Sequence, residues 1–331
     1  MSPRPPAQFS QQQVSHVRVD ADSAGRRIDN YLLSLFNGVP RSRIYSMLRK
    51  GEVRVNGRRV GPEARLVADD MLRLPPVRSE PVRTATVPTH SAESLKPLIL
   101  YEDRGLVVIN KPAGMAVHGG SGLRFGVIEA LRHLRPEAPF LELVHRLDRD
   151  TSGCLMVAKK SSVLKRLHEA LRLGRIDKHY LTLLKGRWPA GEKLIRERLQ
   201  KNVTRGGERM VTVAAQGKES TSLFRLLETF AAASLVEVEL ETGRTHQIRV
   251  HAAHSGHPVA GDEKYGDPEF NRRMKSELGL RRLFLHAARL RLPDWEDGEP
   301  LLLDAPLASD LAAVVQELRR RQPVPSSIDI K

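Results

Sequence analysis

The sequence lacks several features that define common protein classes. It contains one cysteine, Cys154, so neither a disulfide framework nor a cysteine-based zinc site is possible within one chain. No run of about 18 apolar residues exists, which argues against a transmembrane helix. Residues 1–16 lack the apolar core of a secretory signal, and we expect them to form a disordered leader. These absences predict a cytoplasmic protein with no membrane partner.

Acidic residues are scarce relative to basic ones. The 331 residues include 54 Lys and Arg but 39 Asp and Glu, which gives a formal net charge of +15. Such a field favours a polyanionic partner, either nucleic acid or an acidic membrane surface. No lipid-anchor motif or amphipathic membrane helix is found, so nucleic acid is the favoured partner, against the alternative of a merely solvated basic surface.

Residues 17–75 have the pattern of a small helix–helix–hairpin domain. Apolar residues recur with helical spacing near its start, at Ile28, Tyr31, Leu32 and Leu35. Ser42 is the expected N-cap of a second helix that stops at Gly51. The dipeptide Asn56-Gly57, flanked by alternating valines and charges, predicts a tight hairpin.

The basic charge is concentrated in this small domain. Residues 26–73 contain eleven Lys and Arg against five Asp and Glu, a net charge of +6. Side chains of this kind neutralise phosphates, so the domain is expected to bind RNA. The candidate RNA contacts are Arg41, Arg43, Arg49, Lys50, Arg54, Arg58 and Arg59.

A linker and a larger domain follow. Residues 76–94 are rich in Pro, Ser and Thr and predict a flexible tether, whereas residues 95–325 mix strand and helix patterns without regular alternation. The expected strands are Leu106–Ile109, Leu155–Ala158, Tyr180–Leu184, Ser222–Leu227, Leu235–Leu240 and Phe284–Leu292. The expected helices are Ser162–Leu173, a segment capped by Thr245 that runs through His254, and Leu307–Arg320. The predicted class is therefore α+β, with a mixed, largely antiparallel sheet.

The segment HRLDRDTSG, residues 145–153, concentrates the chemistry. Two acids and two arginines crowd a turn just ahead of an apolar strand. From the residues alone, a charged surface turn is the simplest reading. Asp148 and Asp150 could also suggest a two-carboxylate glycosidase, but their spacing in a turn does not fix the required separation, and the basic chain suits RNA better.

Five motifs, taken in order, carry a family resemblance. They are KPAG from Lys111, HRLDRDTSG, KHY ending at Tyr180, GRTHQIRVH from Gly243, and RLFLHA from Arg282. Together they resemble the RluA-type family of pseudouridine synthases over roughly residues 95–320, and such a set is far more specific than any single short match. The RSRIYSMLRKGEVRVNGRRV run resembles the S4 RNA-binding domain. The resemblance implies a pseudouridine synthase catalytic domain joined to an S4-like domain.

The resemblance also implies roles for individual residues. Asp148 matches the catalytic aspartate and Arg249 the arginine that ion-pairs with it. Tyr180 matches the aromatic residue that stacks on the target base, with assistance in proton removal from C5 as a further implied role. Arg146 matches the side chain that takes the place of the extruded base, as an enzyme acting on a stacked base requires. Leu285 is the expected apolar wall opposite Tyr180, although ordinary strand packing explains it equally well, and Lys111 is placed among the substrate-binding residues. His145 is expected to shape the loop. No cofactor or metal is implied.

Within the family the domain arrangement resembles the RluC type most closely and the RluD type next. The implied partner is 23S ribosomal RNA or a large-subunit assembly intermediate, modified at several uridines by what we expect to be a monomer. A second class of function is a non-catalytic RNA-binding or ribosome-assembly protein. The set of Asp148, Tyr180 and Arg249 favours the enzyme, because binding alone needs no such trio.

Two remaining patterns suggest ligand sites but are better explained as ordinary structural features. A cluster of histidines suggests a metal site but lacks the HExxH arrangement, so we expect structural histidines that face RNA or the core. The cluster consists of His246, His251, His254 and His257. Gly119–Gly122 lacks the Lys-Ser/Thr of a phosphate-binding loop, and a flexible loop near the cleft is the better interpretation.

Overall fold

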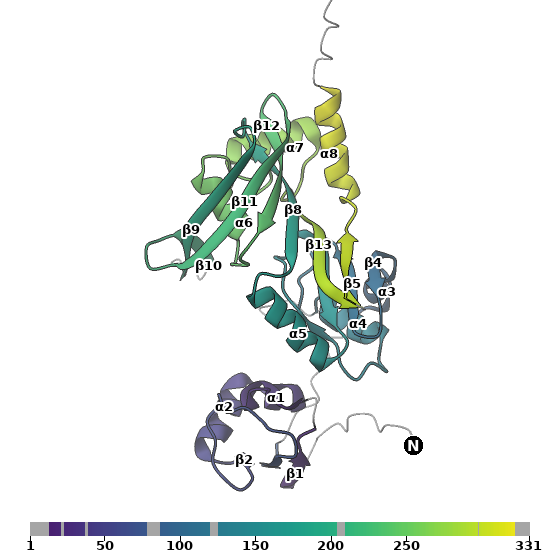
Figure 1. The fold of residues 1–331 in the computed structure, drawn as a ribbon, viewed down its shortest axis with the longest axis vertical. Helices are drawn as coiled ribbons and strands as arrows, with labels where there is room; N and C mark the ends of the chain where they lie inside the picture. The colour runs from purple at the N-terminus through teal and green to yellow at the C-terminus, as the bar shows by residue number, and fades with distance from the viewer. Residues whose placement is uncertain are drawn as a thin grey trace, which may run out of the picture. The chain divides into compact units, whose positions relative to one another are not determined.

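The computed structural model describes residues 13–20, 23–36, 39–77, 87–119, 125–203, 209–296 and 298–321. The chain divides into two compact units, Met1–Val87 and Pro88–Lys331 (Figure 1). Most of the predicted leader, and residues 78–86 of the predicted linker, lie outside the described residues.

The first unit contains the two predicted helices and a small antiparallel sheet. Helices α1 (Ile28–Leu35) and α2 (Arg41–Lys50) pack together through side chains such as Ile28 and Ile44, both inaccessible to solvent. The sheet has the order β1-β3-β2, formed by β1 (Ser15–Arg18), β3 (Met71–Leu74) and β2 (Arg54–Val55).

Three local expectations for this unit need correction. The turn at Asn56-Gly57 forms, with φ of 48° and 77°, and one bridge joins Val55 to Arg58 across it. The expected hairpin goes no further, because β2 pairs with β3 instead. Helix α2 begins at Arg41 after Pro40, whose ring fixes φ but offers no side-chain acceptor for a cap. Ser42 therefore lies inside the helix and not at its N-cap. Strand β1 begins at Ser15, inside the predicted leader.

The second unit is built on one large sheet, which confirms the mixed, largely antiparallel prediction. Its strand order is β10-β9-β11-β12-β8-β13-β7-β5-β4, with β14 paired to β13 and β6 to β7. All these pairs are antiparallel except β13 with β7. The strands are β4 (Ile99–Glu102), β5 (Leu106–Lys111), β6 (Glu142–Leu143), β7 (Ser152–Ala158), β8 (Asp177–Lys185), β9 (Glu192–Val203), β10 (Arg209–Val213), β11 (Lys218–Thr229), β12 (Ala233–Leu240), β13 (Leu285–Glu296) and β14 (Glu299–Asp304).

Helices cover the sheet and its ends (Figure 1). They are α3 (Thr89–Glu93), the 3-10 turn η2 (Lys96–Leu98), α4 (Val127–Leu134), α5 (Ser161–Arg172), α6 (Gln247–His254), α7 (Pro268–Leu278) and α8 (Ser309–Arg320). Helix α3 corrects the predicted linker, because Thr89–Glu93 is helical and its Ala92 is buried. Helices α7 and α8 pack with β8 and β12 around a cluster that includes Leu183, Phe284 and Leu311.

The junction of β7 and β13 explains the Thr-Ser-Gly that closes the HRLDRDTSG segment. Gly153 has φ of 108°, and a Cβ there would lie 2.2 Å from the backbone oxygen of Ala287. Only glycine allows this approach. Beside it, His286 bridges Ser152 Oγ at 2.9 Å and the Ala305 carbonyl at 3.1 Å. The loop that ends at β7 is thus fixed against the middle of the sheet.

Candidate active site

The HRLDRDTSG loop is held by backbone contacts from the KPAG loop. Gly114 donates its N–H to the Arg149 carbonyl at 2.9 Å, and Arg149 Nε donates back to the Gly114 carbonyl at 3.1 Å. Within the loop, Thr151 N donates to the Asp148 carbonyl at 3.2 Å. These bonds fix the backbone from which the Asp148 side chain projects.

Lys111 lies beneath this loop and not on the substrate side of it, which corrects its predicted role. The side chain is inaccessible to solvent, and Nζ donates to the carbonyls of Pro112, Met115 and Arg149 at 2.8, 2.9 and 3.0 Å. Burial lowers the pKa of Lys111 to about 7, with Asp150 and Asp148 acting in the opposite direction. The three carbonyls can accept all three protons of an ammonium group, so we favour the charged form. Lys111 therefore joins the two motif loops.

His145 also shapes the loop. Its Nε2 accepts the backbone N–H of Met156 at 3.1 Å, which requires that nitrogen to be unprotonated. Burial, with a smaller contribution from Lys178, lowers the pKa of His145 to about 4. The imidazole is therefore neutral at neutral pH.

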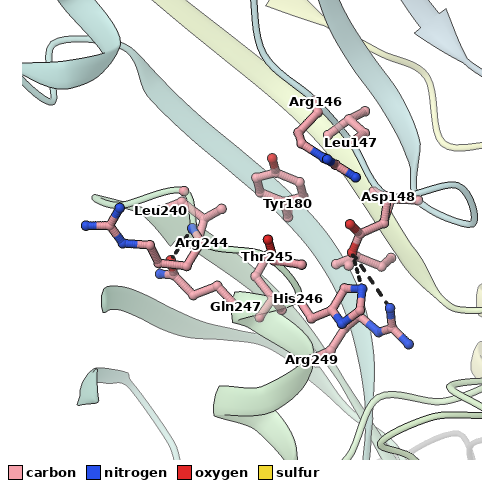
Figure 2. A pocket seen from close by; sticks show the side chains of 14 residues that line it. Arg146, Leu147, Asp148, Tyr180, Leu240, Arg244, Thr245, His246, Gln247 and Arg249 are labelled. Carbon is pink, nitrogen blue, oxygen red and sulfur yellow. Dashed lines mark hydrogen bonds and ion pairs between the residues drawn. The ribbon is translucent and has the colours of Figure 1, made fainter. Parts of the chain in front are cut away.

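Asp148 lines a pocket together with other residues predicted for the site. Arg146, Tyr180 and Leu285 line the same pocket, and Figure 2 shows the side chains of Arg146, Tyr180 and Asp148 near one another. The Asp148 side chain is 22% exposed, so it is open to a substrate. Arg146 is exposed, whereas Tyr180 and Leu285 are buried in neighbouring strands β8 and β13.

Arg249, from α6, reaches Asp148 but binds another acid more closely. Its Nη1 lies 3.7 Å from Asp148 Oδ2, while Nε and Nη2 donate to the two carboxylate oxygens of Asp262 at 2.7 and 2.8 Å. The Asp262 side chain is inaccessible to solvent. Burial opposes its ionisation, yet hydrogen bonds from Arg249 and from the backbone of Tyr265 and Lys264 lower the pKa of Asp262 below its usual value.

Sequence reasoning missed Asp262. The one available signal was physical: a guanidinium buried against a catalytic group needs a carboxylate of its own. The sequence does not show which of the many acids supplies it, because Asp262 follows α6 by several residues and belongs to no quoted motif.

The start of α6 also differs from the prediction. His246, and not Thr245, occupies the N-cap position, with a left-handed φ of 55° and no side-chain cap. The Gln247 side chain organises the turn instead, because its Oε1 accepts from Arg244 N and Thr242 Oγ1, each at 2.9 Å. The His246 Nε2 atom lies 3.7 Å from Asp148 Oδ2 (Figure 2).

The other histidines of the predicted cluster have separate partners. His251 is buried and lies 2.8 Å from Ser220 Oγ, His254 faces Glu197, and His257 Nδ1 contacts the Lys185 carbonyl. Among the residues that the structure describes, no group of three or more His, Cys, Asp and Glu is arranged for a metal ion. The glycine-rich segment from residue 120 lies outside the described residues. In the described parts of the chain no helix is long and apolar enough to span a membrane.

The candidate RNA contacts of the first unit are not equivalent. Six of them are exposed: Arg41, Arg49, Lys50, Arg54, Arg58 and Arg59. Arg43 is half-buried and forms two hydrogen bonds to Glu52, at 3.1 and 2.8 Å. Its charge is therefore largely neutralised within the protein.

Comparisons with known proteins identify the family. A family model described as RNA pseudouridylate synthase matches residues 105–254. Ribosomal large subunit pseudouridine synthase C of Pasteurella multocida is 51% identical over 94% of this chain and 96% of that protein. The chain belongs to the RNA pseudouridylate synthase family. It is thus an enzyme of the pseudouridine synthase class, as the motifs predicted.

Further comparisons agree with this pseudouridine synthase assignment in both units. The Escherichia coli protein of the same name is 52% identical over 92% of this chain and 97% of that protein. A model described as S4 domain matches residues 26–72, which confirms the prediction for the first unit. The solved structure of human RNA pseudouridylate synthase domain containing 4 covers 70% of this chain and 96% of its own, with a TM-score of 0.58 and 26% identity. That of human domain containing 1 covers 71% and 98%, with a TM-score of 0.55 and 29% identity.

Proposed function

We propose that this pseudouridine synthase isomerises several specific uridines in 23S ribosomal RNA, as a cytoplasmic monomer. The names of its relatives, ribosomal large subunit pseudouridine synthase C, support the substrate. The observation that carries the proposal is the pocket in which Arg146, Asp148 and Tyr180 converge. The S4 domain and the net charge of +15 support binding to a long RNA, free or within a large-subunit assembly intermediate.

The reaction needs no cofactor because it is balanced within the nucleoside. The bond from C1′ to N1 of uracil breaks, the base rotates, and a bond from C1′ to C5 forms. C5 loses its proton and N1 gains one. Asp148 can serve this sequence by attacking the sugar or the base, or by removing a sugar proton, and each role needs the ionised carboxylate. Arg249 places a permanent positive charge 3.7 Å from this carboxylate.

Tyr180 and Leu285 form the surfaces between which the uracil ring stacks. Burial, together with the charge of Asp148, raises the pKa of Tyr180 well above its usual value. The phenol therefore keeps its proton at neutral pH and serves as a stacking surface and hydrogen-bond donor, not as a phenolate base. A base in folded RNA must be extruded to reach this pocket. Arg146 is exposed and lines the same pocket, which supports a role in which its guanidinium stacks in the vacated position.

The decisive experiment replaces Asp148 in the full chain. Asp148→Asn preserves the shape of the side chain but removes its charge, so pseudouridine formation in 23S RNA should fall below detection. RNA affinity at fixed salt should stay close to that of the wild type, because most binding energy comes from phosphate contacts elsewhere. Near-normal turnover by the folded variant would contradict the catalytic role of Asp148.

The same assay tests the target. Pseudouridine maps of 23S RNA treated with the pure protein should show several modified uridines. Modification at sites in a different ribosomal helix would indicate the RluD type of target. No pseudouridine in any RNA would indicate the alternative, a non-catalytic RNA-binding or assembly protein.

A further inference from the structure

His246 faces the Asp148 carboxylate from a strained backbone position. Its φ of 55° is uncommon for a residue with a side chain, and such strain persists where the surroundings enforce it. The ring is 16% exposed and points Nε2 at Asp148 Oδ2 from 3.7 Å. This separation exceeds a hydrogen bond, but contacts of catalytic groups in free enzymes are often long and shorten around the substrate.

Tyr265 is the hydrogen-bond partner of the second ring nitrogen of His246. The Tyr265 hydroxyl lies 2.9 Å from the backbone nitrogen of Val211 and 2.8 Å from His246 Nδ1. The Val211 N–H can only donate, so the hydroxyl oxygen accepts there. Its own proton then has His246 Nδ1 as acceptor. A neutral imidazole with an accepting Nδ1 carries its proton on Nε2, the nitrogen that faces Asp148.

The charges around the ring are consistent with the neutral form. Burial lowers the pKa of His246, Asp148 and Asp262 raise it, and Arg249 and Lys264 lower it further. Burial also raises the pKa of Tyr265, so the phenol keeps the proton that it donates. The hydrogen bonds run from Val211 on β10, through Tyr265, to His246 at the start of α6, and the other ring nitrogen of His246 faces the Asp148 carboxylate from 3.7 Å.

We infer that His246 and Tyr265 are positioning residues for the reaction: Tyr265 fixes the imidazole tautomer, and His246 Nε2–H orients the Asp148 carboxylate in the substrate complex. This inference rests on the proposed catalytic role of Asp148. Without the Tyr265 proton, the imidazole can place its proton on Nδ1 instead. Nε2 would then present a lone pair to the carboxylate and repel it.

Tyr265→Phe tests this function, because it removes the hydroxyl that contacts His246 Nδ1, together with the acceptor of the Val211 N–H, and keeps the ring. The phenyl ring can keep the T-shaped contact with His246, at 5.4 Å between centroids, and the position beneath the Arg249 guanidinium, at 5.0 Å. We expect kcat to fall about tenfold with little change in KM, the order found when a hydrogen-bond partner behind a functional group is removed. The acid limb of the pH–rate profile should move to higher pH, because His246 Nδ1 loses the donor that keeps it unprotonated and the imidazole then takes up a proton more readily.

Two further variants distinguish a specific effect on His246 from a general loss of activity. Tyr101→Phe removes another tyrosine hydroxyl, which donates to Asp103 outside the pocket, and should leave both kcat and the pH profile unchanged. His246→Gln removes the imidazole itself. If both residues act through one chain of donors, the double variant Tyr265→Phe/His246→Gln should be no slower than His246→Gln alone.

The outcomes divide clearly. The roles inferred for Tyr265 and His246 would be wrong if the pH profile of Tyr265→Phe were unchanged, or if the losses multiplied in the double variant. In either case an inactive Asp148→Asn would leave the proposed function intact. Full activity of Asp148→Asn would instead overturn the catalytic assignment. If His246→Gln does not fold, the pH profile of Tyr265→Phe against Tyr101→Phe still decides the question.

Discussion

Arg249 lies 2.7 Å from Asp262 but 3.7 Å from Asp148. The arginine that the motif assigns to the catalytic aspartate is therefore anchored by a second acid that lies deeper in the protein. Asp262 holds the guanidinium in place through two hydrogen bonds, and the guanidinium then presents its third nitrogen to Asp148. The two acids consequently differ in their surroundings: Asp262 is buried and holds Arg249, whereas Asp148, the proposed catalytic residue, is partly exposed in the pocket.

Replacing each acid by its amide should separate these contributions. Asp262→Asn leaves the buried Arg249 without its main counter-charge, and breaking a buried pair costs about 3–5 kcal/mol. Asp148→Asn removes a partly exposed carboxylate with only long contacts, so its free energy of unfolding should stay close to that of the wild type. Chemical denaturation of both variants measures this difference. Equal stability of the two variants would contradict the anchoring role of Asp262.

Arg49 and Arg43 offer a matched test of the S4 domain. Arg49 is exposed, whereas the charge of Arg43 is neutralised by Glu52. If Arg49 contacts a phosphate, Arg49→Ala should reduce the slope of log affinity against log salt by about 0.7 to 0.9. Arg43→Ala should change this slope less. The measurement is RNA affinity over a range of salt concentrations, and equal slopes for both variants would rule out this distinction.

The family motifs predicted most of the site because they specify side chains that meet in one pocket. Asp148, Tyr180 and Arg146 converge there although Asp148 and Arg146 lie in the loop before β7 and Tyr180 lies in β8. Lys111 was misplaced because a motif identifies a residue without stating which side of the loop it occupies. Asp262 and Tyr265 were missed because their partners, Arg249 and His246, become neighbours only when α6 folds against the following segment.

The fold was predicted at the level of its class and of most elements, while local ends were less predictable. Strong apolar patterns identified helix α1 and strand β7. The start of α6 was wrong because a capping preference at Thr245 was overridden by the turn that Gln247 organises. The Asn56-Gly57 turn formed, but the pairing of β2 with β3 depends on contacts distant in sequence.

His145 should make the stability of the protein depend on pH. Its folded pKa of about 4 lies below an unfolded value of about 6.5, so between these values the unfolded chain binds more protons. Stability is therefore complete above about pH 6.5 and declines by about 2–3 kcal/mol as the pH falls towards 4. His145→Gln keeps an acceptor for the Met156 N–H but does not titrate. Unfolding curves should show a weaker pH dependence for this variant. Part of the pH dependence that remains should come from His251, because burial also lowers the pKa of His251 to about 4. An unaltered pH dependence would contradict the assignment.

Arg146→Ala should impair modification of folded RNA more than of unstructured RNA. In a stacked helix, extrusion of the target base costs on the order of a few kcal/mol, and in the proposed role of Arg146 its guanidinium offsets part of this cost by stacking in the vacated place. Each 1.36 kcal/mol lost in the barrier is about tenfold in rate, so we expect a 10- to 100-fold loss on a structured 23S fragment. A single-stranded RNA with the same target sequence has little stacking to overcome and should lose much less.

Arg272→Ala, which removes an exposed arginine of α7 outside the pocket, controls for the lost charge. Single-turnover rates on both RNAs give the comparison, and an equal loss on the two substrates would mean that Arg146 binds RNA without assisting extrusion.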